Sequence, residues 1–193
     1  MCAHYPSLLT FIRTHDTVIK AHREGKVEKK DADELVRLLD IVTRERGYLP
    51  NQESCEAIHK IIPWPAVEIL IIHPDDPEKY FLSWREDPYW RGWHIPGGYV
   101  RATHLSLMDA CNSVATRELG NTSAIISARL ITAFLWKDHP YGNPISLVYA
   151  CTVDRLPHTN DYARFFSEVP SPIVPHHVDF IHAYLQSLSG NHP

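Results

Sequence analysis

The chain has 193 residues, of which 44% are hydrophobic and 22% charged, so it is long enough for one globular domain with a buried core. Its formal net charge of −4 argues against nucleic acid as the main partner, because phosphate backbones are bound by clustered Lys and Arg. The longest apolar run, VEILII, has the length of a strand and carries Glu68, so we expect no segment to span a membrane.

The cysteines indicate the redox environment. The four of them, Cys2, Cys55, Cys111 and Cys151, are widely spaced and form no C-x-x-C pair, which argues against a disulfide framework or a zinc knuckle. The N-terminus has no basic segment followed by a long apolar one, so no signal peptide is predicted. These features predict a protein of a reducing compartment, the cytoplasm.

Residues 1–63 show helical patterns separated by breaks. Apolar residues at three- and four-residue spacing predict three helices, over residues 7–25, 30–47 and 51–62. Asp31 or Asp33 is expected to cap the second helix. Pro63 and Pro65 then end the helical pattern, so we place a domain boundary there, with an N-terminal helical region over residues 1–63.

From Val67 onward the pattern changes to strands and turns, and residues 64–193 are expected to form the second domain. The predicted strands are VEILIIH, KYFLSWR, GWHIP, AIISARLITAFLWKDH, ISLVYACTV and ARFFSEV. Helices are predicted over residues 105–119, where Gly120 ends the pattern, and over the closing PHHVDFIHAYLQSLS. Strands, helix, strands and helix in this order predict an α+β fold with a mixed sheet.

One segment carries a recognisable motif, PGGYVRATHLSLMDACNSVATRELG, residues 96–120. It resembles the Nudix hydrolase family, whose signature is G-x5-E-x7-R-E-U-x-E-E-x-G-U, with U a bulky apolar residue. The resemblance implies a Nudix-like α/β/α sandwich around a mixed sheet, here preceded by the N-terminal helical extension. Within the family the chain looks most similar to the GDP-mannose mannosyl hydrolase type, which also has a reduced motif ending in Glu-Leu-Gly.

The motif departs from the family pattern at most of its acidic positions. Glu118 falls on the last metal-binding glutamate, whereas Arg117 falls on its acidic neighbour and reverses the charge. Val114 stands where the first glutamate of the helix is expected, and Ser113 replaces the arginine that braces the helix. His104 stands where the loop glutamate should be, so at most one helical carboxylate is left for a metal.

The resemblance implies a reduced metal site. The carbonyl of Gly98 and the carboxylate of Glu118 would hold one Mg²⁺ or Mn²⁺, since hard cations prefer oxygen ligands. Glu118 would thus be both metal ligand and catalytic residue, and His158, on a later loop, would be the general base that activates water. A divalent ion there would neutralise charge on the phosphoryl oxygens.

The other histidines, of 13 in the chain, are each expected to be surface or core residues. His176 and His177 directly precede the closing helix, where we expect them to cap it or to lie on the surface.

Aromatic and basic residues before the Gly97-Gly98 turn are candidates for substrate binding. Arg85 and Arg91 are expected to contact phosphates, and Tyr89 or Trp90 to stack on a nucleobase. Trp93 is expected to be a core residue, because alternate positions of a half-buried strand favour aromatic side chains.

Two functions remain open from the sequence. The first, which we expect, is an enzyme: a divalent-metal-dependent Nudix-type hydrolase of a nucleoside diphosphate linked to another moiety, such as a nucleotide sugar, with a reduced one-carboxylate metal site. The second is an inactive Nudix-fold module that binds a nucleotide or a protein, with the N-terminal helices forming a partner or homodimer contact. The direction of Arg117 separates them, because a cationic side chain facing the site would repel a metal within about 4–6 Å.

Overall fold

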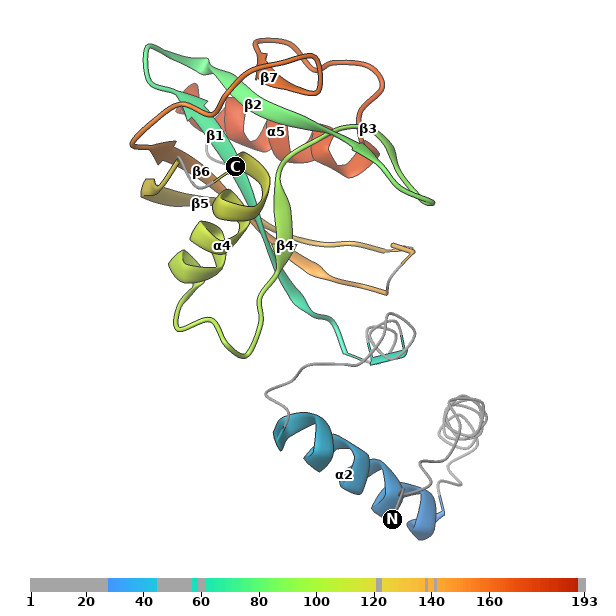
Figure 1. Ribbon diagram of the computed structural model, residues 1–193. Coiled ribbons are helices and arrows are strands. Elements are labelled where there is room, and N and C mark those ends of the chain that lie inside the picture. The colour runs from blue at the N-terminus through green and yellow to red at the C-terminus, as the bar shows by residue number, and fades with distance from the viewer. Residues whose placement is uncertain are drawn as a thin grey trace. The chain divides into compact units, whose positions relative to one another are not determined.

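The computed structural model describes residues 28–44, 57–58, 62–120, 123–137, 139–140 and 142–190. The chain divides into two compact units, Met1–Ala57 and Ile58–Pro193 (Figure 1). Within the described residues, no helix is long and apolar enough to cross a membrane.

The first unit contains helix α2, Lys29–Arg44. The backbone N–H groups of Asp31 and Ala32 donate to the Glu28 carbonyl at 3.0 and 3.2 Å, so the helix starts before the predicted caps. The prediction that Asp31 or Asp33 caps this helix is therefore wrong. Asp31 lies in the first turn, where a carboxylate is favoured by the helix dipole. The helix predicted over residues 7–25 lies outside the described residues, as does most of the one predicted over 51–62.

The second unit is built on a seven-stranded mixed sheet. Its strands are β1 (Pro65–His73), β2 (Asp76–Glu86), β3 (Arg91–His94), β4 (Gly97–Tyr99), β5 (Ile125–Leu135), β6 (Ile145–Val153) and β7 (Ala163–Phe166). The strand order is β3-β2-β1-β6-β5, with β4 paired to β1 and β7 paired to β2. The predicted α+β fold with a mixed sheet is confirmed.

Strand β1 is the centre of this sheet. It runs parallel to β6 along most of its length, while its other edge pairs antiparallel with β4 near its start and with β2 near its end. Because it is paired on both edges and covered on both faces, its sequence is a nearly continuous apolar run. The one ionisable residue within that buried run is Glu68.

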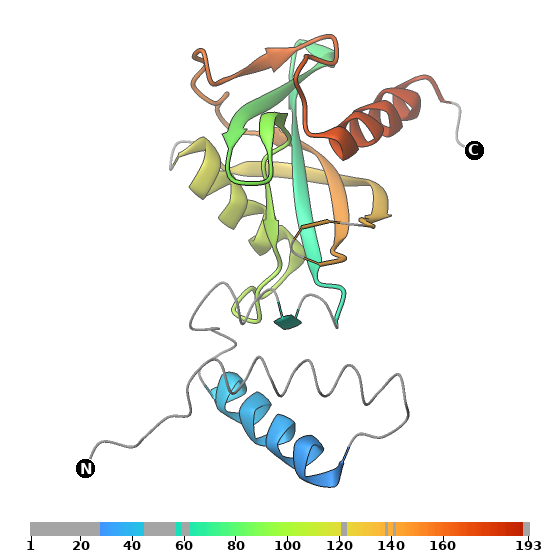
Figure 2. The ribbon, with the colours of Figure 1, turned by 90° about the vertical axis from the view of Figure 1, so that its right-hand side faces the viewer.

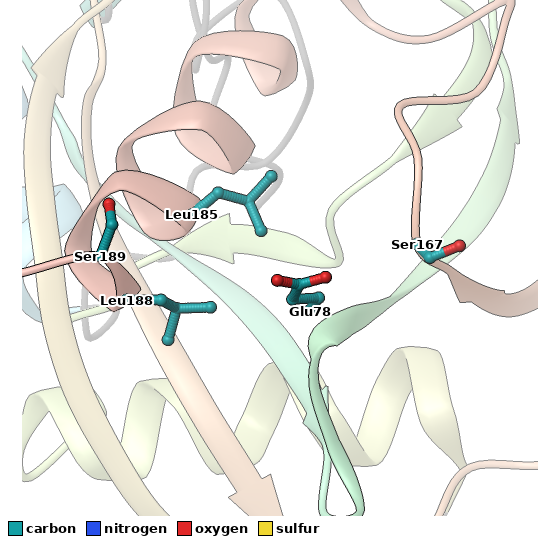
Figure 3. A pocket seen from close by; sticks show the side chains of 5 residues that line it. All are labelled: Glu78, Ser167, Leu185, Leu188 and Ser189. Carbon is teal, nitrogen blue, oxygen red and sulfur yellow. The ribbon is translucent and has the colours of Figure 1, made fainter.

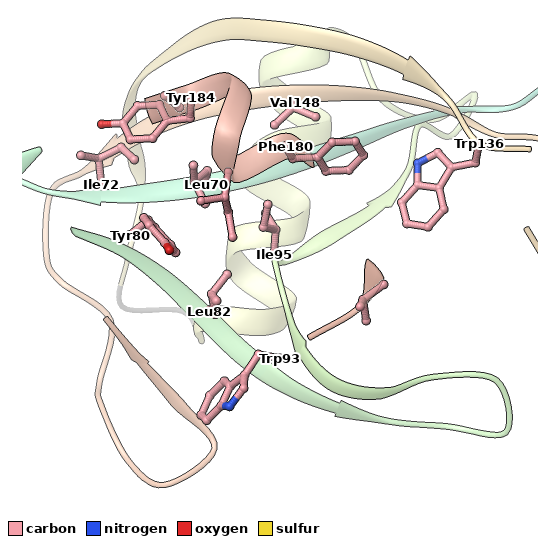
Figure 4. Packing of buried hydrophobic residues seen from close by; sticks show 13 residues of the cluster. Leu70, Ile72, Tyr80, Leu82, Trp93, Ile95, Trp136, Val148, Phe180 and Tyr184 are labelled. Carbon is pink, nitrogen blue, oxygen red and sulfur yellow. The ribbon is translucent and has the colours of Figure 1, made fainter. Parts of the chain in front are cut away.

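Helices α4 (Leu107–Leu119) and α5 (Pro175–Leu188) lie on opposite sides of the sheet (Figure 2). Alternate residues of β1 point to the two faces, as the period of a strand requires. Val67, Ile69 and Ile71 pack with α4, whereas Leu70 and Ile72 pack with α5 in a second cluster (Figure 4). Each fully buried side chain of this size contributes about 1.5–3 kcal/mol of transfer free energy.

The ends of α4 are determined by local capping. The Ser106 hydroxyl accepts the N–H of Asp109 at 3.0 Å, and the Asp109 carboxylate accepts the N–H of Leu105 at 3.0 Å. Gly120 ends the helix with a φ of 81°, which glycine adopts without steric cost. The predicted helix is confirmed, and its last turn presents Arg117 and Glu118 towards the start of β4.

Candidate functional site

The turn predicted at Gly97-Gly98 is wrong: both glycines lie in strand β4, paired with Glu68 and Val67 of β1, because the chain is extended here and is hydrogen-bonded to the central strand. Gly97 is paired with Glu68, and a Cβ on Gly97 would overlap the Glu68 carboxyl group, coming within 2.5 Å of its Cδ. A Cβ on Gly98 would point the other way and meet Arg117, 2.8 Å from Nη2. Both glycines therefore allow a charged side chain to lie directly against the backbone.

Arg117 joins strand β4 to the last residue of the motif. Its Nη2 donates to the Gly97 carbonyl oxygen at 2.7 Å and to Glu118 Oε1 at 2.8 Å. Its side chain is half exposed, whereas that of Glu118 is 19% exposed. Arg117 thus faces the site, and one nitrogen bridges a loop carbonyl and the one remaining motif carboxylate.

The second oxygen of Glu118 is bound by a histidine from β3. His94 Nε2 lies 3.3 Å from Glu118 Oε2, and both side chains are largely buried. Burial acts to raise the pKa of Glu118, but the hydrogen bond and charge of His94, with those of Arg117, outweigh it. The pKa of Glu118 therefore lies below its ordinary value, and the carboxylate is ionised at neutral pH.

The hydrogen bonds of His94 exclude a role as the general base that activates Ser83. Its Nδ1 lies 2.8 Å from the Ser83 carbonyl oxygen, which can only accept, so Nδ1 carries a proton. The Ser83 hydroxyl is farther away, at 3.4 Å. Ser83, His94 and Glu118 superficially form a nucleophile–base–acid series, but Nδ1 cannot take a proton from Ser83 while it donates to the carbonyl. Because the ionised Glu118 also can only accept, His94 holds both partners when each of its ring nitrogens carries a proton.

A second carboxyl group, that of Glu68 in β1, lies against Gly97. Trp136 Nε1 donates to the Ser146 hydroxyl at 2.7 Å, and that hydroxyl donates to Glu68 Oε1 at 3.1 Å. Burial raises the pKa of Glu68 to about 8, although the hydrogen bond from Ser146 acts to lower it. A glutamate inside a buried apolar strand was the signal that could have identified it.

The expectation that His176 and His177 cap the closing helix or lie on the surface is wrong for His177. It lies within α5 and is 3% exposed, and its Nδ1 accepts the N–H of Ile95 at 2.7 Å. Burial lowers the pKa of His177 well below its ordinary value, and the charge of His94 acts in the same direction. Pro175 occupies the first position of the helix, which carries no side-chain cap.

Replacing His177 with Ala is expected to lower the free energy of unfolding by about 2 kcal/mol, because it leaves the buried N–H of Ile95 without an acceptor and opens a cavity. Urea denaturation would measure the loss. His182→Ala, at an exposed position of the same helix, is the matched control. Equal stability of the two variants would contradict a structural role for the His177–Ile95 hydrogen bond.

The predicted substrate-binding residues lie on and beside the β2–β3 loop. Asp87 organises this loop, since its Oδ1 accepts the N–H groups of Tyr89 and Trp90, each at 2.9 Å. Arg85 pairs with Asp87, and its charge acts on the buried Glu68, so its guanidinium lies near the site. Arg91 is exposed and lies 3.6 Å from Glu86.

The two aromatic candidates for base stacking differ in their surroundings. Trp90 packs against Trp136 and His139 of the β5–β6 hairpin, with ring centroids 6.4 and 6.0 Å apart, so part of its surface is already covered. Tyr89 is 48% exposed. Trp93 is 6% exposed, which confirms it as a core residue.

His158, the predicted general base, is exposed on the connection between β6 and β7. Within the described part of the chain, no hydrogen bond or ion pair joins it to Glu118, whose contacts are with His94 and Arg117. The structure thus brings Gly97, Gly98 and Glu118 together without connecting His158 to them.

Gly97, Glu118 and Glu68, in the contacts that they make here, do not suit a divalent metal. Such an ion would need several free oxygen ligands, but both oxygens of Glu118 and the carbonyl of Gly97 are already bound. Glu68 is buried, and its Oε1 is hydrogen-bonded to Ser146. No group of three or more His, Cys, Asp or Glu side chains among the described residues is arranged to hold a metal.

A separate hollow lies between the end of α5 and strand β2 (Figure 3). It is lined by Glu78, Ser167, Leu185, Leu188 and Ser189. None of the site residues discussed above lines it, so it is distinct from the site at Gly97 and Gly98.

Solved structures that are similar to this chain include Nudix proteins. A MutT Nudix hydrolase from Burkholderia pseudomallei superposes with a TM-score of 0.53 at 19% identity, over 63% of this chain and 98% of that one. NrtR from Shewanella oneidensis gives 0.51 at 14% identity, over 66% and 63% of the two chains. The MutT protein from Methanosarcina mazei Go1 gives 0.50 at 15% identity, over 65% and 96%. No family model and no curated protein matches the sequence.

The fold of this chain is therefore that of the Nudix proteins, as the motif led us to expect. At these identities the likeness carries the fold alone. It gives no support to the narrower GDP-mannose mannosyl hydrolase type, so the chemistry has to be argued from the site.

Proposed function

We propose that this chain is a Nudix-fold module that binds a nucleoside diphosphate derivative without hydrolysing it by the metal-dependent route. The observation that carries the proposal is the position of Arg117. Its Nη2 bridges Glu118, which the resemblance implies as a metal ligand, and the carbonyl of Gly97, the neighbour of the implied ligand Gly98. Of the two functions left open by the sequence, a site-facing Arg117 favours the second.

Electrostatics supports the same choice. A divalent ion beside Glu118 would lie within a few ångströms of the Arg117 guanidinium, and like charges at such distances disfavour one another strongly. Compared with the family pattern, position 117 has lost a negative charge and gained a positive one. The formal charge at the site is therefore two units more positive. A phosphate group would instead be attracted to the Arg117 guanidinium.

The ligand side of the proposal uses residues of the β2–β3 hairpin. Arg85 and Arg91 would contact phosphoryl oxygens, and the exposed ring of Tyr89 would stack on a base, with Trp90 forming the wall behind it. A cytoplasmic setting is part of the proposal and is supported by the free thiols of Cys111 and Cys151. A homodimer contact through the N-terminal helices is an additional proposal from the sequence.

A metal-dependent hydrolase is the second candidate, and one observation favours it. Glu118 is kept ionised in a largely buried place, as a single-carboxylate site for Mg²⁺ or Mn²⁺ with Gly98 would require. In this alternative Gly98 and Glu118 would hold the ion in place of the contact between Glu118 and Arg117, and His158 would be the general base.

Turnover and binding assays distinguish the two candidates. Nucleotide sugars and other nucleoside diphosphate derivatives would be incubated with Mg²⁺, Mn²⁺ or EDTA, and phosphate and sugar release measured for the wild type and for Glu118→Gln. We expect no metal-dependent release, together with ligand-induced thermal stabilisation that persists in EDTA. Metal-dependent turnover that disappears in Glu118→Gln would establish the hydrolase instead.

A further inference from the structure

We infer that the Arg117 guanidinium takes the place of the divalent metal, as a cation built into the chain that binds a phosphoryl group of the ligand directly. This inference rests on the proposed function and assigns the anchoring contact of that same site. The ligand class it selects is a phosphoanion such as a diphosphate, bound without a metal.

The positive charge of Arg117 lies between the Gly97 carbonyl and the Glu118 carboxylate. Arg117 Nη2 lies 2.7 Å from the Gly97 carbonyl oxygen and 2.8 Å from Glu118 Oε1, so a single cationic nitrogen already satisfies both oxygens. The absence of a side chain at Gly98 lets the guanidinium lie against strand β4, since a Cβ there would come within 2.8 Å of Nη2 and 3.2 Å of Nη1. The Gly97 carbonyl and the Glu118 carboxylate are therefore both in contact with the Arg117 guanidinium, without an ion between them.

Arg117 has N–H donors that its contacts with Gly97 and Glu118 do not use. A guanidinium has five N–H donors in a planar arrangement. The two contacts of Nη2 account for two of them, and no contact within the described residues uses Nε or Nη1 of Arg117. The side chain is 50% exposed, and three of its charged donors have no partner among the described residues. Arginine N–H groups make short, charge-assisted bonds to phosphate.

Arg117 is held in place rather than freely solvated. Glu118, which binds it, is itself fixed through Oε2 by His94, and His94 is fixed by the Ser83 carbonyl. This series reaches from α4 through β3 to β2, so the guanidinium is oriented before a ligand arrives. Orientation in advance reduces the entropy lost on binding.

A purely structural role is the alternative. Arg117 could act only as a tie between the last turn of α4 and β4, where a basic residue also favours the helix dipole. In that case its removal would lower stability and leave phosphate binding unchanged, so binding and stability have to be measured separately.

The test is isothermal titration of pyrophosphate into the full chain, in EDTA and at constant ionic strength. We expect the wild type to bind, Arg117→Gln to bind roughly 10- to 100-fold more weakly, and Arg117→Lys to fall between them. Arg37→Gln removes a positive charge from helix α2 in the other compact unit, and is expected to bind as the wild type does. Thermal denaturation of each variant shows that it is folded.

Two results would overturn the inference: no pyrophosphate binding by the wild type in EDTA, or equal binding by the wild type and Arg117→Gln. The proposed function fails in a different way, by metal-dependent turnover of the nucleotide derivatives. If nucleotide derivatives bind in EDTA with the same affinity in Arg117→Gln, the proposed function stands and Arg117 is not the anchor.

Discussion

Replacing Gly97 with Ala is expected to lower the free energy of unfolding by about 3 kcal/mol, because the new methyl group would overlap the Glu68 carboxyl group. Glu68 cannot move away easily. It is 7% exposed, and its carboxyl group is hydrogen-bonded to Ser146, which in turn is hydrogen-bonded to Trp136. Gly97 has no positive φ, so the cost is one of space and not of backbone conformation.

Gly98→Ala is the matched control for this prediction. The Cβ of the new residue would meet the end of Arg117, a half-exposed side chain that can be displaced at a lower cost than the buried Glu68. We therefore expect a stability loss below about 1 kcal/mol. Pyrophosphate binding should nevertheless weaken, since the shift moves the guanidinium. Urea denaturation measures both variants, and similar losses at the two glycines would contradict the predicted overlap with Glu68.

Stability is also expected to fall at alkaline pH because of Glu68. Its pKa is 4.5 in the unfolded reference and about 8 in the folded chain, so the folded state retains the proton. The stabilisation is complete below pH 4.5 and is lost as pH rises through 8, a change of roughly 4 to 5 kcal/mol over that window. Between pH 6.5 and 8.5 the wild type should lose about 2 kcal/mol more than Glu68→Gln.

The glutamine variant is suited to this test because its amide oxygen can still accept from Ser146 while carrying no titratable proton. His177 contributes with the opposite sign: its folded pKa is depressed, so its stabilisation is present above pH 6.5 and is lost below it. The chosen range avoids that effect. Glu78→Gln, at an exposed position, should follow the wild-type pH profile. Parallel profiles for the wild type and Glu68→Gln would contradict a buried neutral Glu68.

Much of the fold could be predicted because its causes are local. Strands β5 and β6 follow from runs of apolar residues separated by a turn, and α4 follows from apolar spacing ended by Gly120. The start of α2 was misplaced, since a carboxylate at Asp31 favours the first turn of a helix as well as its cap. Local patterns therefore identified the elements more reliably than their ends.

Only part of the candidate site could be predicted from local sequence patterns. Gly98 and Glu118 were named from the motif, and the structure does bring β4 and the end of α4 together. The direction of Arg117 was left open, because helical spacing places a side chain on a face but does not show which neighbour it meets.

By itself the sequence determined the class of fold, the motif and the loss of its acids. The tertiary structure alone decided what replaces them: Glu118 binds His94 of another element, Glu68 binds Ser146 at a separation of 78 residues, and Ile95 binds His177 at 82. These contacts depend on how distant elements pack, and a buried proton or charge takes its state from all the groups around it.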